Sequence, residues 1–413
     1  MSAKTSVSGI LVAERRDFYL NPRKTTELWP SEIPLTTFSK KLASKRTKDP
    51  DFKMFEHRGK WEDMKWQSKT TVTALPAVGA SSTVVYDATK LNGIVPYVGL
   101  QCDVWSDSSG PTTYKGQIVI TAVNTTTTTL TFSLVHKSGT PSFAVGDWFL
   151  VVGHASEEGT GAPEAWADDL SVIYNSTQIF KTSVEVTGTL YDLALRGYSK
   201  EFARLQAEKR KEHALKMEKA FLFGRRIGGT SAGPAHMLGP NGMPIRTTDG
   251  AYSIISNASQ VKTVDVTTTP ADAFKNLVSA SRDVFQYSNS KGIKYAFVGD
   301  GFLEKLSGAV DDKTTYNIKA GENRFGFDIR TVETPTGIYK LVRSPLMTRT
   351  SGGLYANKAI IIDPENVKHV TYRAPKYQTS IHANDYDGQK DQYMNDEGIA
   401  LTMPETHWIM ELT

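Results

Sequence analysis

The pattern of apolar and polar positions changes along the chain. In its first two parts, residues 1–70 and 71–155, this pattern predicts no helices. Residues 1–70 show little continuous periodicity and hold scattered prolines, so we expect an extended N-terminal arm. Residues 71–155 are rich in Thr, Val, Ser and Gly, and short apolar runs recur there between turn signals such as Asn92-Gly93. Several short strands at this spacing predict a small β-barrel or sandwich.

The pattern changes to a helical period at about 189–223, a stretch without proline that Gly224 follows. About 35 residues at 1.5 Å each correspond to roughly 50 Å of helix. Such a helix exceeds one small core and has a polar middle at Glu208–His213. We therefore expect it to lie across a sheet with this middle exposed or against a neighbouring subunit. Its two apolar stripes are Tyr198, Phe202 and Leu205, and Ala214, Met217 and Phe221.

The rest of the chain mixes loops, strands and helices. Residues 156–188 begin as a loop and end as a strand, and residues 224–260 are rich in Gly and Pro, which predicts a long loop. After it we expect an α/β unit followed by closing strands. The predicted elements are a helix at 270–285, a strand at 295–298, a short helix at 301–307, and strands near 327–332, 338–342, 359–363, 367–373 and 407–412.

Composition and charge fit an ordinary globular protein. Of the 413 residues, 39% are hydrophobic and 22% are charged, which is enough apolar material for a core. The net charge of +4 is too small for a dedicated nucleic-acid binder. Cys102 is the single cysteine, which excludes an internal disulfide, and we expect it half-buried in a strand. The apolar runs are too short to span a bilayer, and the first 18 residues do not resemble a signal peptide.

A search for reactive side chains yields no expected catalytic, cofactor-binding or metal site. The sequence contains no HExxH, no CxxC pair and no P-loop. Gly229–Gly233 matches GxSxG formally, with Ser231 as the nucleophile. That motif requires a strand before it and a helix after it, whereas here a helix precedes it and Pro234 follows. A flexible loop is the favoured interpretation.

Other candidate residues also favour structural roles. The acidic positions do not fit a calcium loop, because Gly388 comes too early and no closing Glu is present, so we expect an exposed acidic turn. The eight histidines show no ligand spacing. Glu218 lies beside an apolar stripe, and we expect it to be partly buried and paired with a Lys or Arg. The acidic positions are Asp385, Asp387, Asp391 and Asp396, and the histidines are His57, His136, His154, His213, His236, His369, His382 and His407.

Two segments combine basic residues with possible binding roles. The first, Lys40–Lys48, is expected to be a solvated surface, with contact to phosphate or to an acidic neighbouring subunit as the alternative. The second interleaves basic and aromatic side chains, which either stack on single-stranded nucleic acid or belong to a strand with one packed face. Its residues are Tyr372, Arg373, Lys376 and Tyr377, and those of the first are Lys40, Lys41, Lys45, Arg46 and Lys48.

Several short motifs stand in a definite order along the chain. They are Pro34-Leu35-Thr36-Thr37, Asp49-Pro50-Asp51-Phe52 with Phe55-Glu56, Tyr174–Phe180, Val184–Thr189, Lys211–Ala220 with Gly224, and Ile362–Glu365. Together with the order of arm, β-rich segment, long helix and α/β unit, they resemble the tailed-bacteriophage major capsid (major head) protein family of podophage type. The resemblance covers nearly the whole chain.

The resemblance implies the Hong Kong 97-like capsid fold: an α+β protein with a long spine helix packed on a β-sheet, an axial α/β domain, an N-terminal arm and an extended loop. Residues 1–70 would form the arm and the start of the extended loop, and 71–155 a β-rich insertion domain in that loop. Residues 156–260 would hold the return of the loop, the spine helix and the Gly-rich loop of a peripheral domain. Residues 261–350 would form the axial domain, and 351–413 the closing strands of the peripheral domain.

The same resemblance implies a shell protein of the virion that assembles in the host cytoplasm. Copies would form hexamers and pentamers of an icosahedral head around double-stranded DNA, which would contact the inner face non-specifically. Expected partners are further copies of the chain, a portal protein, a scaffold and decoration proteins. No enzymatic activity, cofactor or membrane contact is expected. Some relatives cross-link neighbouring subunits through a lysine and an asparagine, but neither partner aligns with this sequence.

Three alternatives remain open from the sequence. A phage tail or adhesion protein would use the β-rich segment as a binding module. A hydrolase would use Ser231. A bacterial nanocompartment shell would share the fold but enclose cargo enzymes.

Overall fold

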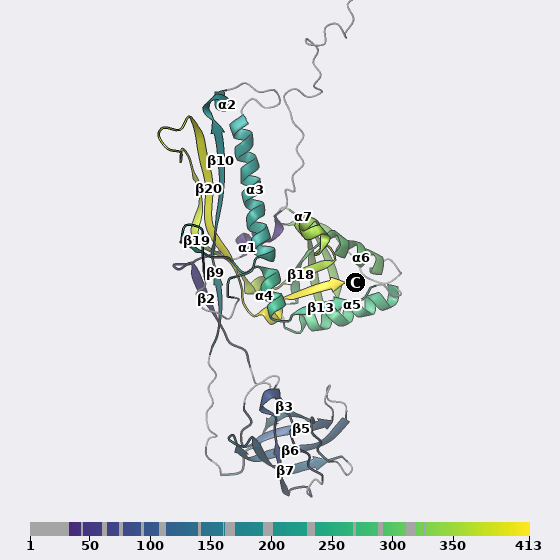
Figure 1. Ribbon diagram of the computed structural model, residues 1–413. Coiled ribbons are helices and arrows are strands. Elements are labelled where there is room, and N and C mark those ends of the chain that lie inside the picture. Colours follow the sequence, from purple (N-terminus) through teal and green to yellow (C-terminus); the bar gives the residue numbers. More distant parts are fainter. Residues whose placement is uncertain are drawn as a thin grey trace, which may run out of the picture. The chain divides into compact units, whose positions relative to one another are not determined.

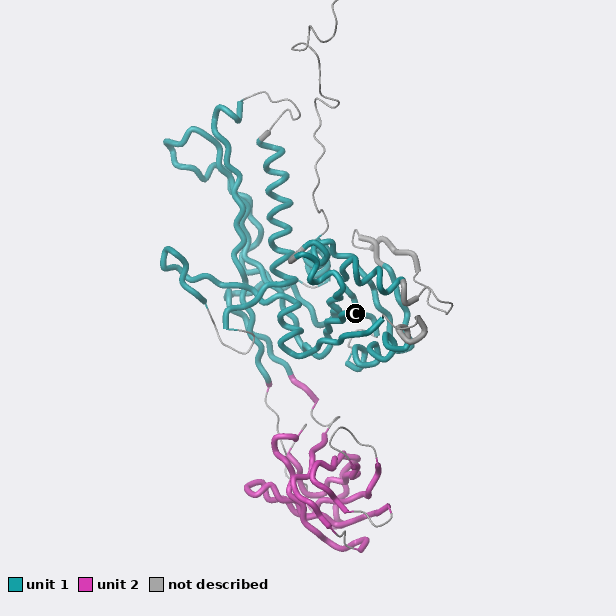
Figure 2. The backbone as a smooth tube through the Cα atoms, turned by 45° about the vertical axis from the view of Figure 1, so that its right-hand side comes forward, with its two compact units in different colours: residues 1–56, 171–413 teal, residues 57–170 magenta. Residues whose placement is uncertain are grey.

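The computed structural model describes residues 33–42, 44–59, 64–73, 77–91, 95–106, 113–138, 142–159, 161, 170–192, 201–228, 236–266, 270–287, 292–310, 319–324 and 327–413. The chain forms two compact units, 1–56 with 171–413 and 57–170 (Figure 2). Helices and strands are mixed in the first unit, whereas the described part of the second is almost entirely β-structure.

The start of the first unit corrects the expectation of a coreless arm. Residues Pro34–Leu42 form helix α1, which Pro34 can begin because the first helical position needs no intrahelical N–H donor. Leu35 and Phe38, one turn apart, are both fully buried. The sequence pattern did not predict this helix, because the stretch is short and prolines lie near it. Pro34 at its first position and the apolar pair Leu35 and Phe38 at helical spacing would have indicated it.

The long helix packs on a four-stranded sheet, as expected (Figure 1). Helices α2 (Gly188–Asp192) and α3 (Glu201–Phe223) occupy the predicted helical stretch, and residues 193–200 with Tyr198 lie outside the described residues. The 23 residues of α3 correspond to about 35 Å. The sheet order is β1–β19–β20–β10, with bounds Ser44–Arg46, Val367–Gln378, Gly388–Leu401 and Gln178–Thr187.

Side chains of β10 explain why α3 lies where it does. Burial alternates along the strand, so that Phe180, Thr182, Val184 and Val186 face inward. The expected polar middle of α3 is exposed only in part. His213 is buried, and its two ring nitrogens lie 3.1 Å from the Thr182 hydroxyl and 2.9 Å from Asn395 Oδ1. Helix and sheet are therefore joined by polar as well as apolar contacts.

A seven-stranded sheet forms the other part of the first unit. The order is β13–β21–β18–β14–β17–β16–β15. Helix α5 (Pro270–Phe285) coincides with the prediction, and α6 (Asp300–Val310) and α7 (Pro345–Arg349) also belong to this part. The strands span Val261–Val264, Trp408–Leu412, Lys358–Ile362, Ile293–Val298, Gly337–Arg343, Phe327–Thr334 and Lys319–Arg324 in sheet order.

The predicted closing strands are divided between the two sheets. Strands β18 and β21 pair antiparallel in the seven-stranded sheet, whereas β19 joins β20 in the four-stranded sheet. The strand β20 was not predicted, because its sequence is rich in charged and polar residues that period-based reasoning assigns to a turn.

The Gly-rich segment is more ordered than expected. It contains the hairpin of β11 (Met237–Leu238) and β12 (Pro244–Ile245), and helix α4 (Ala251–Asn257). Gly224 ends α3 as predicted, and the reason is a close approach of two backbone segments. A Cβ on Gly224 would lie 2.4 Å from the Ala220 oxygen and 2.7 Å from the Thr248 oxygen. A substitution there must move backbone atoms.

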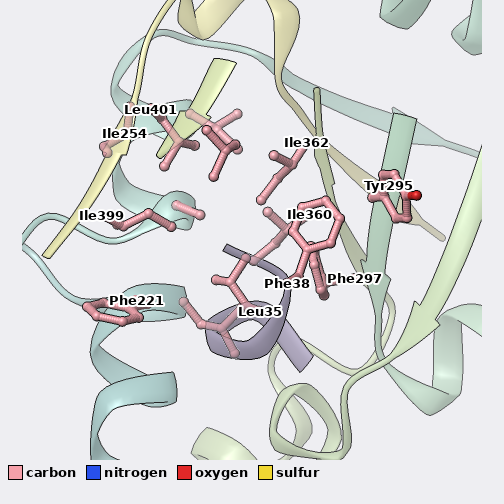
Figure 3. Close-up of a cluster of buried hydrophobic side chains, with 14 of the residues drawn as sticks. Leu35, Phe38, Phe221, Ile254, Tyr295, Phe297, Ile360, Ile362, Ile399 and Leu401 are labelled. Carbon is pink, nitrogen blue, oxygen red and sulfur yellow. The ribbon is translucent and has the colours of Figure 1, made fainter. Parts of the chain in front are cut away.

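One hydrophobic cluster connects α1, α3, α4 and strands of both sheets (Figure 3). Leu35 and Phe38 of α1 enter it, and the Phe38 ring lies 4.5 Å from that of Tyr295 and 5.5 Å from that of Phe297. A helix close to the N-terminus thus completes a core whose other members come from residues 180 to 409. Helix α1 is therefore an integral part of the fold.

The second unit is a closed β-barrel. Its sheet order is β3–β8–β5–β6–β7–β4. The end strands are also joined, because Ser68 pairs with Tyr86 and the Lys69 N–H donates a 2.7 Å hydrogen bond to the Val85 oxygen. The barrel predicted at 71–155 therefore includes a strand further toward the N-terminus. The strands span Lys65–Gln67, Trp148–His154, Leu100–Ser106, Thr113–Asn124, Thr129–Lys137 and Ser81–Val85 in sheet order.

The barrel has a separate core. All buried members of its cluster lie between Met64 and Phe149. Trp66 is fully buried here and stacks on Phe149 with ring centroids 5.9 Å apart. Cys102 is fully rather than half buried, and burial raises the pKa of its thiol. The thiol is thus unreactive, and Cys102 serves as a small apolar residue of the barrel core.

Substituting Phe132 by Ala should destabilise the barrel alone. Phe132 is fully buried, and such truncations cost about 3–5 kcal/mol. Differential scanning calorimetry should show two transitions, of which the variant lowers one. Val135→Ala, at a 43% exposed position of the same strand, is the matched control. An equal shift of both transitions would show that the two units unfold together.

Candidate assembly surfaces

The Glu218 carboxylate fastens α1 to the central helix α3. It is fully buried, and its Oε1 accepts a 2.8 Å hydrogen bond from the Leu35 N–H. Its Oε2 accepts hydrogen bonds from the N–H and the hydroxyl of Thr36, at 2.7 and 2.5 Å. N–H groups in the first turn of a helix have no intrahelical acceptor, and negative charge is favourable there. Glu218 thus binds a helix N-terminus, and the predicted partner, a Lys or Arg, is wrong.

Two opposing effects act on the Glu218 carboxyl. Burial raises its pKa, whereas the three donors favour the ionised form and lower it. The burial effect is the larger one. In either protonation state the donors of α1 depend on this one side chain.

A second polar contact holds the other end of α1. Glu397 of β20 is buried, and it accepts from Lys40 Nζ at 3.0 Å and from His369 Nε2 at 3.1 Å. His369 Nδ1 lies 3.4 Å from the Ser39 hydroxyl. Burial acts to raise the pKa of Glu397, but the hydrogen bond from His369 and the charge of Lys40 outweigh it and lower the pKa. Lys40 is therefore a structural cation, although its side chain is 36% exposed.

A two-stranded ribbon connects the two units in sequence. Strand β2 (Asp51–Glu56) pairs antiparallel with β9 (Ser171–Ser176), from Asp51 opposite Ser176 to Glu56 opposite Ser171. Its base is fixed, because the buried Asn175 amide donates to the backbone oxygens of Asp249 and Ile399 at 3.1 and 2.7 Å. Near the other end, the Phe55 side chain is 59% exposed. The ribbon is anchored at its base and carries an exposed aromatic ring, and the Lys53 ammonium lies 5.6 Å from the centroid of that ring.

A further apolar surface lies on the β11–β12 hairpin. Four large apolar side chains of this hairpin are exposed, and the exposed fraction reaches 71% at Met243. Isolated two-stranded hairpins are only marginally stable, so packing against another surface would stabilise this one. The four residues are Met237, Leu238, Met243 and Ile245.

The predicted acidic turn is correct for two of its four residues. Asp385 and Asp387 are exposed in the connection between β19 and β20. Asp391 and Asp396 instead lie buried on β20, where Asp391 bonds the Tyr377 hydroxyl and Asp396 accepts from Arg373 at 3.3 Å. Within the described ranges no group of three or more His, Cys, Asp or Glu side chains could hold a metal ion.

Sequence reasoning missed a buried lysine. Lys294 lies on β14 with no exposed surface, and its ammonium donates to the backbone oxygens of Val284, Tyr287 and Thr406 at 2.6, 2.9 and 2.6 Å. Burial lowers its pKa to about 8. The single charged residue in the otherwise apolar run at 293–298 was the available signal. Through these three carbonyl acceptors, Lys294 links β14 to the end of helix α5 and to the segment at Thr406.

The two basic segments noticed in the sequence meet in the structure. Arg46, Thr47 and Lys48 line a cleft together with Tyr372 and Arg373. The GxSxG segment with Ser231 lies outside the described residues. No helix in the described part of the chain is long and apolar enough to cross a membrane.

Comparison with known proteins identifies the family. The family model described as "SU10 major capsid protein" matches residues 30–413. No curated protein matches the chain. A solved structure from Mycobacterium phage Bobi is 10% identical, with a TM-score of 0.45 and coverage of 99% of both chains. The capsid of a native GTA particle is 12% identical, with a TM-score of 0.38 and coverage of 96% of this chain and 95% of that one.

The mature capsid of bacteriophage PhiM1 is 11% identical, with a TM-score of 0.40, and the match covers 63% of this chain and 79% of that chain. The assignment rests on the family model, which spans nearly the entire sequence. The chain therefore belongs to the SU10 major capsid protein family.

Proposed function

We propose that copies of this chain associate as hexamers and pentamers that close into an icosahedral head around double-stranded DNA. Family membership makes the chain a structural protein of the virion, where it builds the capsid shell from many copies. The observation that carries the finer proposal is the ribbon of β2 and β9. Its base is fixed by Asn175, while the Phe55 side chain near the other end is 59% exposed. An exposed aromatic ring on an anchored ribbon offers a contact for a second subunit.

Further partners belong to the same proposal. A portal protein, a scaffold and decoration proteins would complete the head, and the shell would enclose DNA on its inner face. The chain would act without catalysis, cofactor or metal. The family match does not favour a tail or adhesion protein or a nanocompartment shell. The division into an axial domain and a peripheral domain is proposed for the seven-stranded and four-stranded parts of the first unit.

Replacing Phe55 by Asp should abolish shell formation without unfolding the subunit. A charge at the centre of an apolar contact costs several kcal/mol in each interface, whereas an exposed substitution changes the stability of a monomer by about 0.5 kcal/mol or less. Sedimentation and negative-stain electron microscopy should detect particles with the wild type, expressed with its head-assembly partners where these are needed, and none with the variant.

The control for this test is Val135→Asp, which places the same charge at an exposed apolar position of the barrel. Circular dichroism and a denaturation midpoint should be unchanged in both variants. Shells of normal size and yield from Phe55→Asp would refute the ribbon as an assembly contact.

A further inference from the structure

A cleft lies where the chain leaves the short edge strand β1, beside strand β19. The two strands run parallel, with Arg46 opposite Thr371, and the Thr47 N–H then donates a 3.0 Å hydrogen bond to the Thr371 oxygen. This pairing brings Arg46 and Lys48 to Tyr372 and Arg373, and these residues with Thr47 line a cleft of about 610 Å³. A cleft of this volume falls within the range of ligand-binding sites.

The walls of the cleft are held by local hydrogen bonds. The Thr47 hydroxyl donates to the Asp49 oxygen at 2.8 Å, and Asp49 Oδ1 accepts from the Asp51 N–H at 2.9 Å. These bonds form a turn that presents Lys48. On the opposite wall, Arg373 is fixed through one nitrogen by Asp396, 3.3 Å away. The side chain of Arg373 and the backbone of the turn at Lys48 are therefore placed before any ligand arrives.

Positive charge in the cleft exceeds negative charge. Arg46 and Lys48 are exposed, and no carboxylate within the described ranges forms an ion pair with either of them. The charged side chains that line the cleft are all cationic, and of these Arg373 is paired with Asp396. Three cationic groups thus face an open cavity with one of them neutralised. Such a site selects an anion with several negative oxygens.

We propose that this cleft binds the phosphate backbone of duplex DNA, and that it is a contact between the shell and the enclosed genome. The inference rests on the proposed function, because it requires DNA inside the shell. The guanidinium fork of Arg46 matches two phosphate oxygens, Lys48 adds a point charge, and the Tyr372 hydroxyl can donate to a phosphate. Contacts to phosphate carry no sequence information, so we expect binding that is independent of sequence.

An acidic segment of a second copy is the rival ligand. The exposed acidic pairs among the described residues are Asp385 with Asp387 and Glu157 with Glu158. Each offers two carboxylates, whereas duplex DNA offers a phosphate charge about every 1.7 Å of its axis. A continuous polyanion can engage Arg46, Lys48 and Arg373 together, and it can do so on every subunit. The charges of the cleft therefore favour DNA.

The test measures binding of the full-length unassembled protein to a fluorescent 30-base-pair duplex by anisotropy at several salt concentrations. The variant Arg46→Gln/Lys48→Gln removes two phosphate contacts and leaves Arg373 with its partner Asp396. Because each contact contributes about 0.9 to the slope of log affinity against log salt, the slope should fall by about 2. The matched control is Lys181→Gln/Lys368→Gln, an equal loss of charge at exposed positions of the same sheet outside the cleft.

The outcomes separate this inference from the proposed function. A slope that falls in the cleft variant and not in the control supports the phosphate site. Equal slopes in wild type and cleft variant overturn it. Binding of poly-L-glutamate in preference to DNA, with the same loss in the variant, also overturns it and assigns the cleft to an acidic protein segment. Shell formation by the wild type, expressed with its head-assembly partners, is followed separately by electron microscopy, and its absence contradicts the proposed function whatever the salt slopes are.

Discussion

Replacing Glu218 by Ala should lower the free energy of unfolding by about 3–5 kcal/mol, since three buried donors lose their acceptor at once. Each unsatisfied buried donor costs about 1–3 kcal/mol, and the total is limited by local relaxation of α1. Undocking α1 also uncovers the core contacts of Leu35 and Phe38. Chemical denaturation followed by circular dichroism measures the loss. Trypsin should cleave after Lys40 and Lys41 sooner than in the wild type.

Two further variants show whether the contact with α1 is responsible. Glu218→Gln keeps one acceptor oxygen and should cost less than the Ala variant. Glu212→Ala removes a carboxylate from the same helix, but one whose partners Lys209 and Lys216 are partly exposed, so its effect should stay below about 1 kcal/mol. Equal losses in Glu218→Ala and Glu212→Ala would contradict a special role of the buried carboxylate.

Acidification should destabilise the first unit through His407. This ring is fully buried, its Nδ1 accepts a 3.0 Å hydrogen bond from the Asp363 N–H, and its Nε2 lies 3.2 Å from the Thr402 oxygen. Burial, together with the charge of Lys294, lowers its pKa to about 3. The folded protein therefore holds a neutral ring, whereas the unfolded chain binds a proton below about pH 6.5. This contribution to stability is present above pH 6.5 and is lost as the pH falls toward 3.

The expected loss between pH 6.5 and pH 4 is about 3 kcal/mol, from 1.36 kcal/mol for each pH unit. It is measured as the change in unfolding free energy with pH. His407→Asn retains an acceptor for the Asp363 N–H and does not titrate, so the dependence on pH should be weaker by that amount. His382→Asn, at an exposed turn, should leave it unchanged. An unaltered pH dependence in His407→Asn would show that the ring is protonated without cost.

Much of the fold follows from local sequence, because helix and strand signals agree there with burial. Helix α5 begins at Pro270 and ends at Phe285 as predicted, since proline fits the first turn and the apolar face recurs at helical spacing. The barrel strands alternate buried and exposed positions, and β7 does so from Leu130 to Leu134. The secondary structure of such segments can be predicted from the local sequence alone.

The features that escaped prediction depend on partners distant in sequence. Strand β20 holds Asp391, Asp396 and Glu397, and charged residues in a buried strand are stable only when they are paired. Those pairs are made by Tyr377, Arg373 and Lys40. The basic cleft likewise exists because β1 pairs with β19 across more than 300 residues. Hydrophobic periodicity and amino-acid composition give no information about contacts between residues so distant in sequence.

The pairing of β2 with β9 has an evolutionary consequence. Because Glu56 lies opposite Ser171, the chain departs for the barrel and returns from it at neighbouring positions. A domain whose two ends are adjacent can be gained, lost or exchanged without altering the host fold, as a guest module tolerated between paired strands. Residues 57–170 are thus the part of this sequence that can diversify rapidly, or accept an engineered display domain, while the shell architecture is inherited unchanged.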